Sequence, residues 1–237
     1  MSDSLVIIPT YNEKENIENM IRKVFSFEKD FHLLIVDDGS PDGTANIVKS
    51  LQNEFPGRLH IEERSGKLGL GTAYIHGFNW ALDREYEYVF EMDADFSHNP
   101  EDLIRLYNAC AIDGGDLSVG SRYCKGGGVE NWPWNRKLLS YYASVYVRIV
   151  LGIKVGDTTA GFICYTRKVL KDLDFEKVTF KGYAFQVCMK YMAVKKGHRL
   201  IEVPIIFKDR QYGESKMSIA IFREALIGVW RMRKMKL

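Results

Sequence analysis

The first half of the chain alternates short apolar runs with segments whose apolar residues recur at helical spacing, and this alternation restricts the fold more than any other feature. Strands that alternate with helices form mostly parallel sheets with right-handed crossovers. We therefore predict an α/β fold, a single domain with a mostly parallel central sheet flanked by helices. The predicted strands are 5–8, 33–36, 59–63, 88–92 and 117–122, and the predicted helices are 12–27, 44–55, 70–83 and 100–111.

The second half of the chain is less regular. Glycines at 126–128 and a Trp-Pro-Trp run at 132–134 predict a loop. Pro9 is expected to end the first strand, and Pro204 interrupts a later one. The remaining predicted elements are helices at 138–151, 183–195 and 217–235 and strands at 162–166 and 200–207.

Length and charge limit the classes of protein. The chain has 237 residues and a net charge of +2, which fits one folded domain and gives no support for nucleic-acid binding. The four cysteines form no Cys-x-x-Cys pair and have no histidine at ligand spacing, which argues against a zinc site and for free thiols in a reducing compartment. We see no signal peptide and no run of about twenty apolar residues, so contact with lipid is expected to be peripheral.

Polar residues gather where the predicted strands end. They follow the first, second, fourth and fifth strands, at 9–13, 37–40, 93–97 and 120–123. The carboxyl ends of parallel strands meet at one edge of a sheet, and ligands bind there. The sequence therefore predicts one crevice formed by four loops.

Asp93 and Asp95 are the most informative pair of residues in this predicted crevice. Residues two apart on an extended segment point the same way, and two such carboxylates repel each other unless a cation lies between them. A hard divalent cation meets this need and can also bind a diphosphate, and Ser97 can add a hydroxyl. The alternative is a solvated turn in which an aspartate caps the next helix.

Two common nucleotide motifs are absent. No Gly-x-Gly-x-x-Gly follows the first strand, which argues against a dinucleotide-binding domain. The glycine-rich run at 66–71 lacks the order of a P-loop. We predict a tight strand-to-helix turn there, with a nucleotide contact from its backbone.

Three segments together resemble the family 2 glycosyltransferases of the GT-A fold. They are Val-Ile-Ile-Pro-Thr-Tyr-Asn-Glu at 6–13, Val-Asp-Asp-Gly-Ser-Pro-Asp-Gly-Thr at 36–44 and Met-Asp-Ala-Asp-Phe-Ser-His at 92–98. Further segments at 120–123, 135–137, 157–162, 181–186 and 209–217 narrow the likeness to dolichol-phosphate (polyprenyl-phosphate) mannosyltransferases. The most selective of them is Tyr-Gly-Glu-Ser-Lys at 212–216. The resemblance implies a Rossmann-like nucleotide-binding half and a catalytic domain over 1–216.

The resemblance also implies roles for individual residues. Tyr11 and Asp38 would contact the base and Glu13 the ribose, with Pro9 and Ala94 also in the donor site. Asp93, Asp95 and Ser97 would surround Mg²⁺ or Mn²⁺, although relatives often carry Gln at the position of Ser97. Phosphates of donor and acceptor would be held by Arg122, Arg136, Arg210 and Lys216, since two phosphorylated substrates repel each other without cations. Asp95, Arg122, Arg136 and Asp157 form the expected catalytic set, with Asp157 orienting Arg136 or a substrate.

The implied reaction is a direct displacement. An acceptor phosphate oxygen attacks mannose on GDP-mannose and inverts the anomeric centre, giving a β-linked lipid phosphate mannose. The acceptor would be dolichyl or undecaprenyl phosphate. Two alternatives stay open, a related enzyme that uses UDP-glucose or another nucleotide sugar, and a nucleotide-sugar-binding protein without turnover.

A lipid acceptor implies work at a membrane surface. Residues 217–237 place apolar side chains at helical spacing beside basic residues, which fits an amphipathic helix lying on a membrane. The helix at 138–151 is a second candidate. The alternatives are that both pack on the core, or that a partner protein supplies the membrane helices. We expect a peripheral protein at the cytoplasmic face of a membrane.

Overall fold

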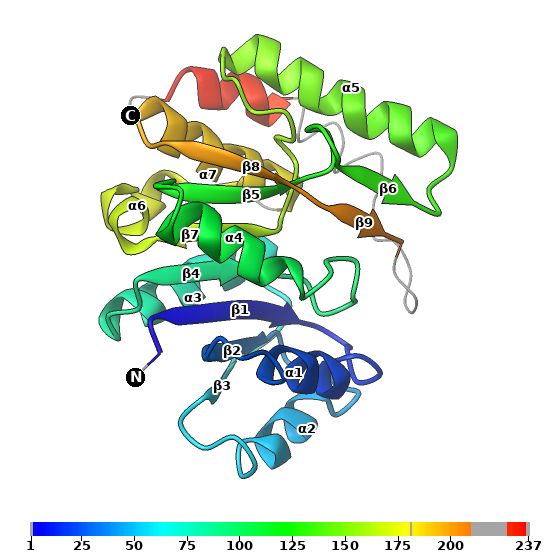
Figure 1. The fold of residues 1–237 in the computed structure, drawn as a ribbon, viewed down its shortest axis with the longest axis vertical. Helices are drawn as coiled ribbons and strands as arrows, with labels where there is room; N and C mark the ends of the chain where they lie inside the picture. Colours follow the sequence, from blue (N-terminus) through cyan, green and yellow to red (C-terminus); the bar gives the residue numbers. More distant parts are fainter. Residues whose placement is uncertain (1, 181, 210–226, 236–237) are drawn as a thin grey trace.

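A computed structural model describes residues 2–180, 182–209 and 227–235. Its centre is a seven-stranded sheet in the order β3-β2-β1-β4-β7-β5-β8 (Figure 1). All neighbouring pairs are parallel except the two that β7 makes, with β4 and β5. This confirms the predicted α/β class and the mostly parallel sheet. The strands are β1 (Ser4–Thr10), β2 (Phe31–Asp37), β3 (Leu59–Glu63), β4 (Tyr88–Glu91), β5 (Leu117–Ser121), β7 (Ile163–Thr166) and β8 (Leu200–Pro204).

Helices cover both faces of the sheet (Figure 1). They are α1 (Ile17–Phe25), α2 (Thr44–Leu51), α3 (Leu70–Asp83), α4 (Asp102–Ala111), α5 (Trp134–Leu151), α6 (Arg167–Asp172) and α7 (Tyr183–Lys195), with a 3₁₀ turn, η1 (Phe175–Lys177). Residues 227–233 are also helical.

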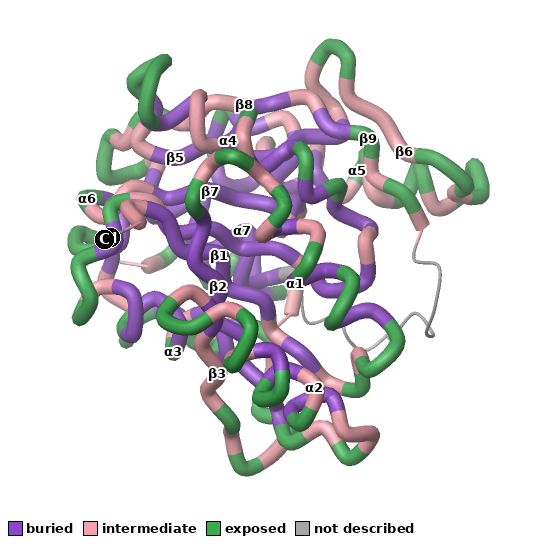
Figure 2. Tube along the Cα trace, turned by 60° about the horizontal axis from the view of Figure 1, so that its bottom comes forward, coloured by how far each residue is buried: buried purple, intermediate pink, exposed green. Residues whose placement is uncertain are grey.

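The central strand explains why its sequence is apolar without alternation. Leu5 and Ile7 join the core under α3, α6 and α7, whereas Val6 and Ile8 join the core under α1, α2 and α4. Successive side chains of a strand point to opposite faces, so a strand with helices on both sides is apolar throughout. Figure 2 shows this buried layer running through the middle of the molecule. At Gly77 of α3 the contact is so close that a Cβ would lie 2.8 Å from the Ile7 side chain.

Several predicted boundaries were wrong. β1 continues through Pro9 to Thr10. Proline has no N–H to donate, but β4 pairs with β1 only as far as Ile7, so no carbonyl of β4 is left without a donor at Pro9. α1 begins at Ile17 and not at residue 12, since Asn12 has a positive φ of 60° and starts a turn.

Predictions in the second half needed larger corrections. The loop predicted at 126–128 contains the start of β6 (Gly128–Glu130), and α5 begins at Trp134, directly after Pro133. The strand predicted at 200–207 is divided at Ile205 into β8 and β9 (Ile206–Lys208), and β9 pairs with β6 in a separate two-stranded sheet. The helix α6 was not predicted. Of the helix predicted at 217–235, residues 217–226 lie outside the described residues.

The topology gathers chain segments at one edge of the sheet. β1, β2, β4 and β5 are parallel, so their carboxyl ends lie at the same edge. β7 runs the other way, so its amino end lies at that edge as well. The segment 156–161, which leads toward β7, is thereby brought beside the loop that follows β5.

Candidate active site

A cleft of about 620 Å³ opens at this edge of the sheet. Most of the residues singled out in the sequence line it, and they come from four strand ends and from α5. Asp157 lies behind the lining, while Arg210 and Lys216 are outside the described residues. The lining positions are Pro9, Tyr11, Glu13, Asp38, Asp93, Ala94, Asp95, Ser97, Arg122 and Arg136.

Two neighbouring aspartates at the end of β2 have different environments. Asp37 is buried and accepts hydrogen bonds from the hydroxyls of Thr10 and Ser40, both at 2.7 Å. Asp38 lines the cleft and forms an ion pair with Arg64, with Nε and a terminal nitrogen at 2.6 and 2.5 Å from Oδ1. Only Asp38 is therefore placed to meet a ligand.

Sequence reasoning missed two cations at this end of the cleft. Arg64 follows β3 and also donates to the carbonyl of Gly69, at 3.3 Å, so it fixes the glycine-rich turn as well as Asp38. The Lys67 ammonium lies 4.9 Å from the centre of the Tyr11 ring and lines the cleft. Their position beside the glycines was the available signal, because phosphate-binding turns combine glycine with basic residues.

The Asp93–Ser97 loop turns sharply at Phe96, whose φ is 59°. The Ser97 amide donates to Asp95 Oδ1 at 3.0 Å, and the Asp93 amide donates to His98 Nδ1 at 3.2 Å. Burial lowers the pKa of His98 to about 4, so its ring is neutral and its Nδ1 can accept. The ring stacks on Phe162 with centroids 4.8 Å apart. His98, which the resemblance included only as part of a motif, thus shapes this loop.

The oxygens of this loop are of the kind that a divalent cation binds. Asp95 is buried, and the buried Ser97 Oγ has no hydrogen-bond partner among the described residues. Over 2–180, 182–209 and 227–235, no group of three or more His, Cys, Asp or Glu side chains is arranged to hold a metal. The oxygens of Asp93, Asp95 and Ser97 fit a hard cation that takes its remaining ligands from water or a diphosphate.

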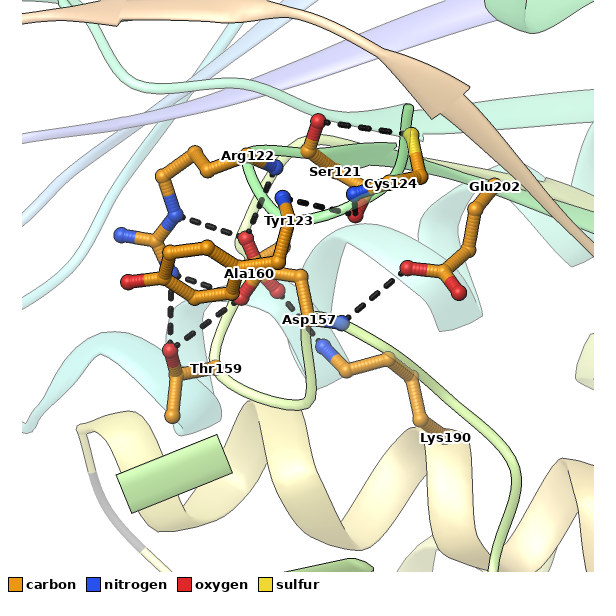
Figure 3. A network of polar contacts seen from close by, with 9 residues as sticks. All are labelled: Ser121, Arg122, Tyr123, Cys124, Asp157, Thr159, Ala160, Lys190 and Glu202. Carbon is orange, nitrogen blue, oxygen red and sulfur yellow. Dashed lines mark hydrogen bonds and ion pairs between the residues drawn. The ribbon is translucent and has the colours of Figure 1, made fainter. Parts of the chain in front are cut away.

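Arg122 and Asp157 form a buried ion pair beside this loop (Figure 3). The guanidinium donates to both Asp157 oxygens at 2.6 and 2.7 Å and to Thr159 Oγ1 at 2.8 Å, and the Arg122 amide adds a bond of 3.0 Å. Burial acts to raise the pKa of Asp157, but the charges of Arg122 and Lys190 and the hydrogen bonds from Arg122 outweigh it. Asp157 therefore orients Arg122, an arginine other than the Arg136 that was expected as one of two alternatives beside a substrate.

Arg136 lies in the first turn of α5 and pairs with Asp209, with 3.0 and 3.1 Å from NH1 to the two oxygens. Its guanidinium is 4.1 Å from the centre of the Trp132 ring, and that of Arg122 is 5.6 Å from the same ring. The two arginines thus share one aromatic neighbour. Two guanidinium groups that line the same cleft can bind a phosphate between them.

Beyond the arginines the cleft becomes apolar. One wall of the cleft is apolar there and is continuous with the polar part. It is formed by side chains of α5, α7 and residues 227–233. The wall is formed by Leu139, Ala143, Tyr146, Val147, Ala184, Val187 and Val229.

The outer side of α5 also exposes large apolar side chains. Trp134, Tyr142 and Ile149 are 74%, 61% and 74% exposed, although Val147 and Val150 of the same helix are buried. In residues 227–233, Val229 and Met232 are buried, Arg233 donates to the Val150 carbonyl at 3.1 Å, and Trp230 is half exposed. Both proposed membrane elements therefore pack on the core by one side and expose apolar side chains on the other. None of the described helices is long and apolar enough to cross a membrane.

Comparison with known proteins agrees with the motifs. Residues 5–174 match the model of glycosyl transferase family 2. The chain is 47% identical to the polyprenol monophosphomannose synthase of Mycolicibacterium smegmatis, over 97% of this chain and 87% of that protein. It is 44% identical to the undecaprenyl-phosphate mannosyltransferase of Micrococcus luteus, over 96% and 92%. With the dolichol-phosphate mannosyltransferase of Pyrococcus furiosus it shares 34% identity, over 97% of this chain and 63% of that one.

Solved structures support the fold. Glucosyl-3-phosphoglycerate synthase from Mycobacterium tuberculosis in complex with phosphoglyceric acid superposes with a TM-score of 0.73 over 98% of this chain and 80% of that one, at 16% identity. The same enzyme with Mn²⁺, UDP-glucose and phosphoglyceric acid gives a TM-score of 0.71, with the same coverage and identity. These likenesses confirm the predicted fold.

Proposed function

Because this chain belongs to the family 2 glycosyltransferases, we propose that it is an inverting enzyme that transfers mannose from GDP-mannose to a polyprenyl phosphate. One observation carries the proposal, the 47% identity over 97% of the chain to a protein named as a polyprenol monophosphomannose synthase. The cleft has the chemistry that such substrates require. It joins a carboxylate loop, two arginines and an apolar wall on one surface.

The carboxylate loop is the proposed site for Mg²⁺ or Mn²⁺. Asp93, Asp95 and Ser97 would hold the ion, which when bound offsets negative charge on the donor diphosphate and on the leaving GDP. The buried Ser97 hydroxyl, which has no hydrogen-bond partner in the part of the chain that the structure describes, supports this assignment.

The donor nucleotide is proposed to lie over the ends of β1 and β2. Asp38, held by Arg64, offers a fixed carboxylate oxygen to the base, and Tyr11 offers a ring face beside Lys67. Glu13 lines the cleft on the ribose side. Pro9 and Ala94 shape the floor between base and metal loop.

The acceptor phosphate is proposed to bind Arg122 and Arg136. Its oxygen is anionic at neutral pH, so the reaction needs alignment and charge stabilisation more than a strong general base. Attack opposite to the leaving diphosphate inverts the anomeric centre. Arg210 and Lys216, outside the described residues, are proposed as further phosphate ligands, and the prenyl chain would follow the apolar wall.

We also propose that the protein acts peripherally at a membrane surface. α5 and residues 227–233 lie beside each other at one end of the molecule (Figure 1). Both expose large apolar side chains, and both also contribute residues to the apolar wall of the cleft. The four cysteines are free thiols, which fits the cytoplasmic face of a membrane.

The proposed function is tested by transfer of labelled sugar to a short-chain polyprenyl phosphate, with Mg²⁺ or Mn²⁺ and then with a chelator. We expect metal-dependent formation of a lipid-linked mannose from GDP-mannose. Product from UDP-glucose but not from GDP-mannose would replace the donor assignment. Binding of nucleotide sugars without product from any donor would favour a protein without turnover.

A further inference from the structure

Lys190 is a fully buried lysine that the proposed chemistry does not use. It lies on α7, and its ammonium donates to the carbonyl of Ala160 at 2.6 Å (Figure 3). Taking an ammonium out of water costs several kcal/mol unless nearby groups compensate it. Burial lowers the pKa of Lys190, while the carboxylates of Glu91 and Asp157 act to raise it. The negative charges of Glu91 and Asp157 therefore partly compensate the cost of burying the Lys190 ammonium.

The carbonyl that Lys190 binds belongs to the segment 156–161, which has no strand or helix of its own. Glu202 on β8 accepts from the amides of Gly156 and Asp157 at 2.8 and 3.0 Å. Arg122 holds Asp157 and Thr159 from the end of β5. Side chains from three separate elements thus fix this segment, and Figure 3 shows them converging on it.

The segment in turn forms part of the cleft. Thr159, Ala160 and Gly161 line the cleft, and Asp157 fixes the plane of the Arg122 guanidinium. A shift of the backbone at Ala160 would move Thr159 and Asp157, which are the partners of Arg122. The bond from Lys190 to Ala160 therefore connects Lys190, through the segment 156–161, to the partners of Arg122.

We propose that Lys190 is a positioning residue, which fixes the segment 156–161 through the Ala160 carbonyl and so holds Arg122 in the orientation that receives the acceptor phosphate. The kinetic part of this inference rests on the proposed function, because it assumes that Arg122 binds the acceptor. The structural part does not.

The test compares Lys190→Met with Lys196→Met. Lys196 is the control. Its ammonium also donates to a backbone carbonyl, that of Asp172, but Lys196 is exposed and follows the far end of α7. We expect Lys190→Met to lower kcat/KM for a short-chain polyprenyl phosphate about 10–100-fold, as misplaced groups do. Binding of GDP with Mg²⁺, measured by calorimetry, is expected to stay unchanged, and Lys196→Met to match the wild type in both.

Hydrogen exchange separates this inference from the proposed function. Faster exchange at the amides of Gly156 and Asp157 in Lys190→Met, with unchanged exchange over β1 and β2, supports positioning whatever the enzyme's substrates. Unchanged exchange there, or wild-type acceptor kinetics, would overturn it, as would equal losses for donor and acceptor. If Lys190→Met does not fold, Lys190→Gln replaces it. Its uncharged amide donor lies about one bond short of the position of Lys190 Nζ, so we expect smaller losses of the same kind, and wild-type exchange and kinetics in this variant would overturn the inference. Absence of transfer by the wild type would count only against the proposed function.

Discussion

At the scale of single residues, the cleft depends on side chains that orient other side chains. Asp38 is presented to the cleft because Asp37 is turned inward by Thr10 and Ser40 and because Arg64 holds Asp38 from the other side. Both members of the Asp38–Arg64 pair are only 9% exposed, so solvent screens their interaction weakly. A fixed carboxylate can select a base by its hydrogen-bond donors.

Replacing Arg64 with Met should therefore weaken donor binding specifically. We expect the KM for GDP-mannose to rise about 10-fold, which corresponds to about 1.4 kcal/mol, with little change in the KM for the acceptor. Steady-state kinetics with each substrate varied in turn measures this. Arg58→Met is the control, because Arg58 pairs with Asp30 away from the cleft. Equal effects on both substrates would contradict a role at the nucleotide end.

Asp95 allows a test of the metal site that keeps the loop intact. Its Oδ1 accepts from the Ser97 amide, and Asn can preserve that bond while losing the negative charge. We expect Asp95→Asn to lower kcat by at least about 100-fold, in the range for a lost electrostatic contact, and to require more Mn²⁺ for half-maximal rate. Asp95→Ala should abolish turnover. Metal titrations of the rate check this, and a wild-type metal dependence in Asp95→Asn would remove the assignment.

At the scale of elements, the position of the site was predictable and its support was not. The ends of the strands could be predicted because each is marked by an apolar run followed directly by polar residues such as Asp93 or Arg122. Such a pattern is local in sequence. The antiparallel insertion of β7 was not visible, because strand order depends on packing across the whole sheet. Without it, there was no reason to place Asp157 against Arg122, 35 residues away.

The same limit applies to the other residues that hold the site together. Glu202 and Lys190 look like ordinary surface charges in the sequence, and Asp209 entered only as part of a motif. Only the fold shows Glu202 and Lys190 against the segment 156–161 and Asp209 against Arg136. A buried lysine in a helix such as α7 gives no local signal, because its burial is decided by neighbours on distant strands. The motif resemblance supplied residue types at the cleft, but their partners came from the structure.

The Arg122–Asp157 pair predicts a pH-dependent contribution to stability. Removing one partner of a buried pair costs about 3–5 kcal/mol, so we expect Asp157→Asn to lower the free energy of unfolding by about 3 kcal/mol near neutral pH. The pKa of Asp157 is lowered in the folded protein, so its contribution is present above the ordinary value of 3.8 and is lost as pH falls through the lower folded value.

Urea unfolding at neutral pH and below 3.8 measures this difference. The gap between wild type and Asp157→Asn should shrink on acidification. Asp174→Asn is the control, because Asp174 forms an exposed pair with Lys177 that is worth at most about 1 kcal/mol. A gap that stays constant with pH would show that the Asn variant is destabilised by packing and not by the lost charge.

At the scale of the whole molecule, the two ends of the cleft differ in the polarity of their lining residues. The end proposed for the nucleotide is lined by residues that follow β1 and β2, whereas the other end is lined by residues of α5, α7 and 227–233. Six large apolar residues of α5 are exposed, namely Trp134, Leu138, Leu139, Tyr141, Tyr142 and Ile149, and Leu139 also lines the cleft. A stripe of this kind beside an apolar cleft wall is typical of a helix that lies on a membrane surface, where a lipid phosphate could enter from the bilayer.

The last prediction separates membrane contact from catalysis. Changing Trp134, Tyr142 and Ile149 together to Ser removes exposed apolar area without touching the cleft lining. We expect the fraction of protein that sediments with liposomes to fall at least about 10-fold, because each apolar side chain buried in the membrane contributes about 1.5–3 kcal/mol. We expect kcat with a water-soluble short-chain acceptor to stay within about 2-fold of the wild type. Ile112→Ser, which changes an equally exposed residue after α4, should leave both unchanged. Unaltered liposome binding by the triple variant would shift the membrane contact to another surface or to a partner protein, and a loss of soluble-acceptor activity would mean that this face of α5 shapes the cleft itself.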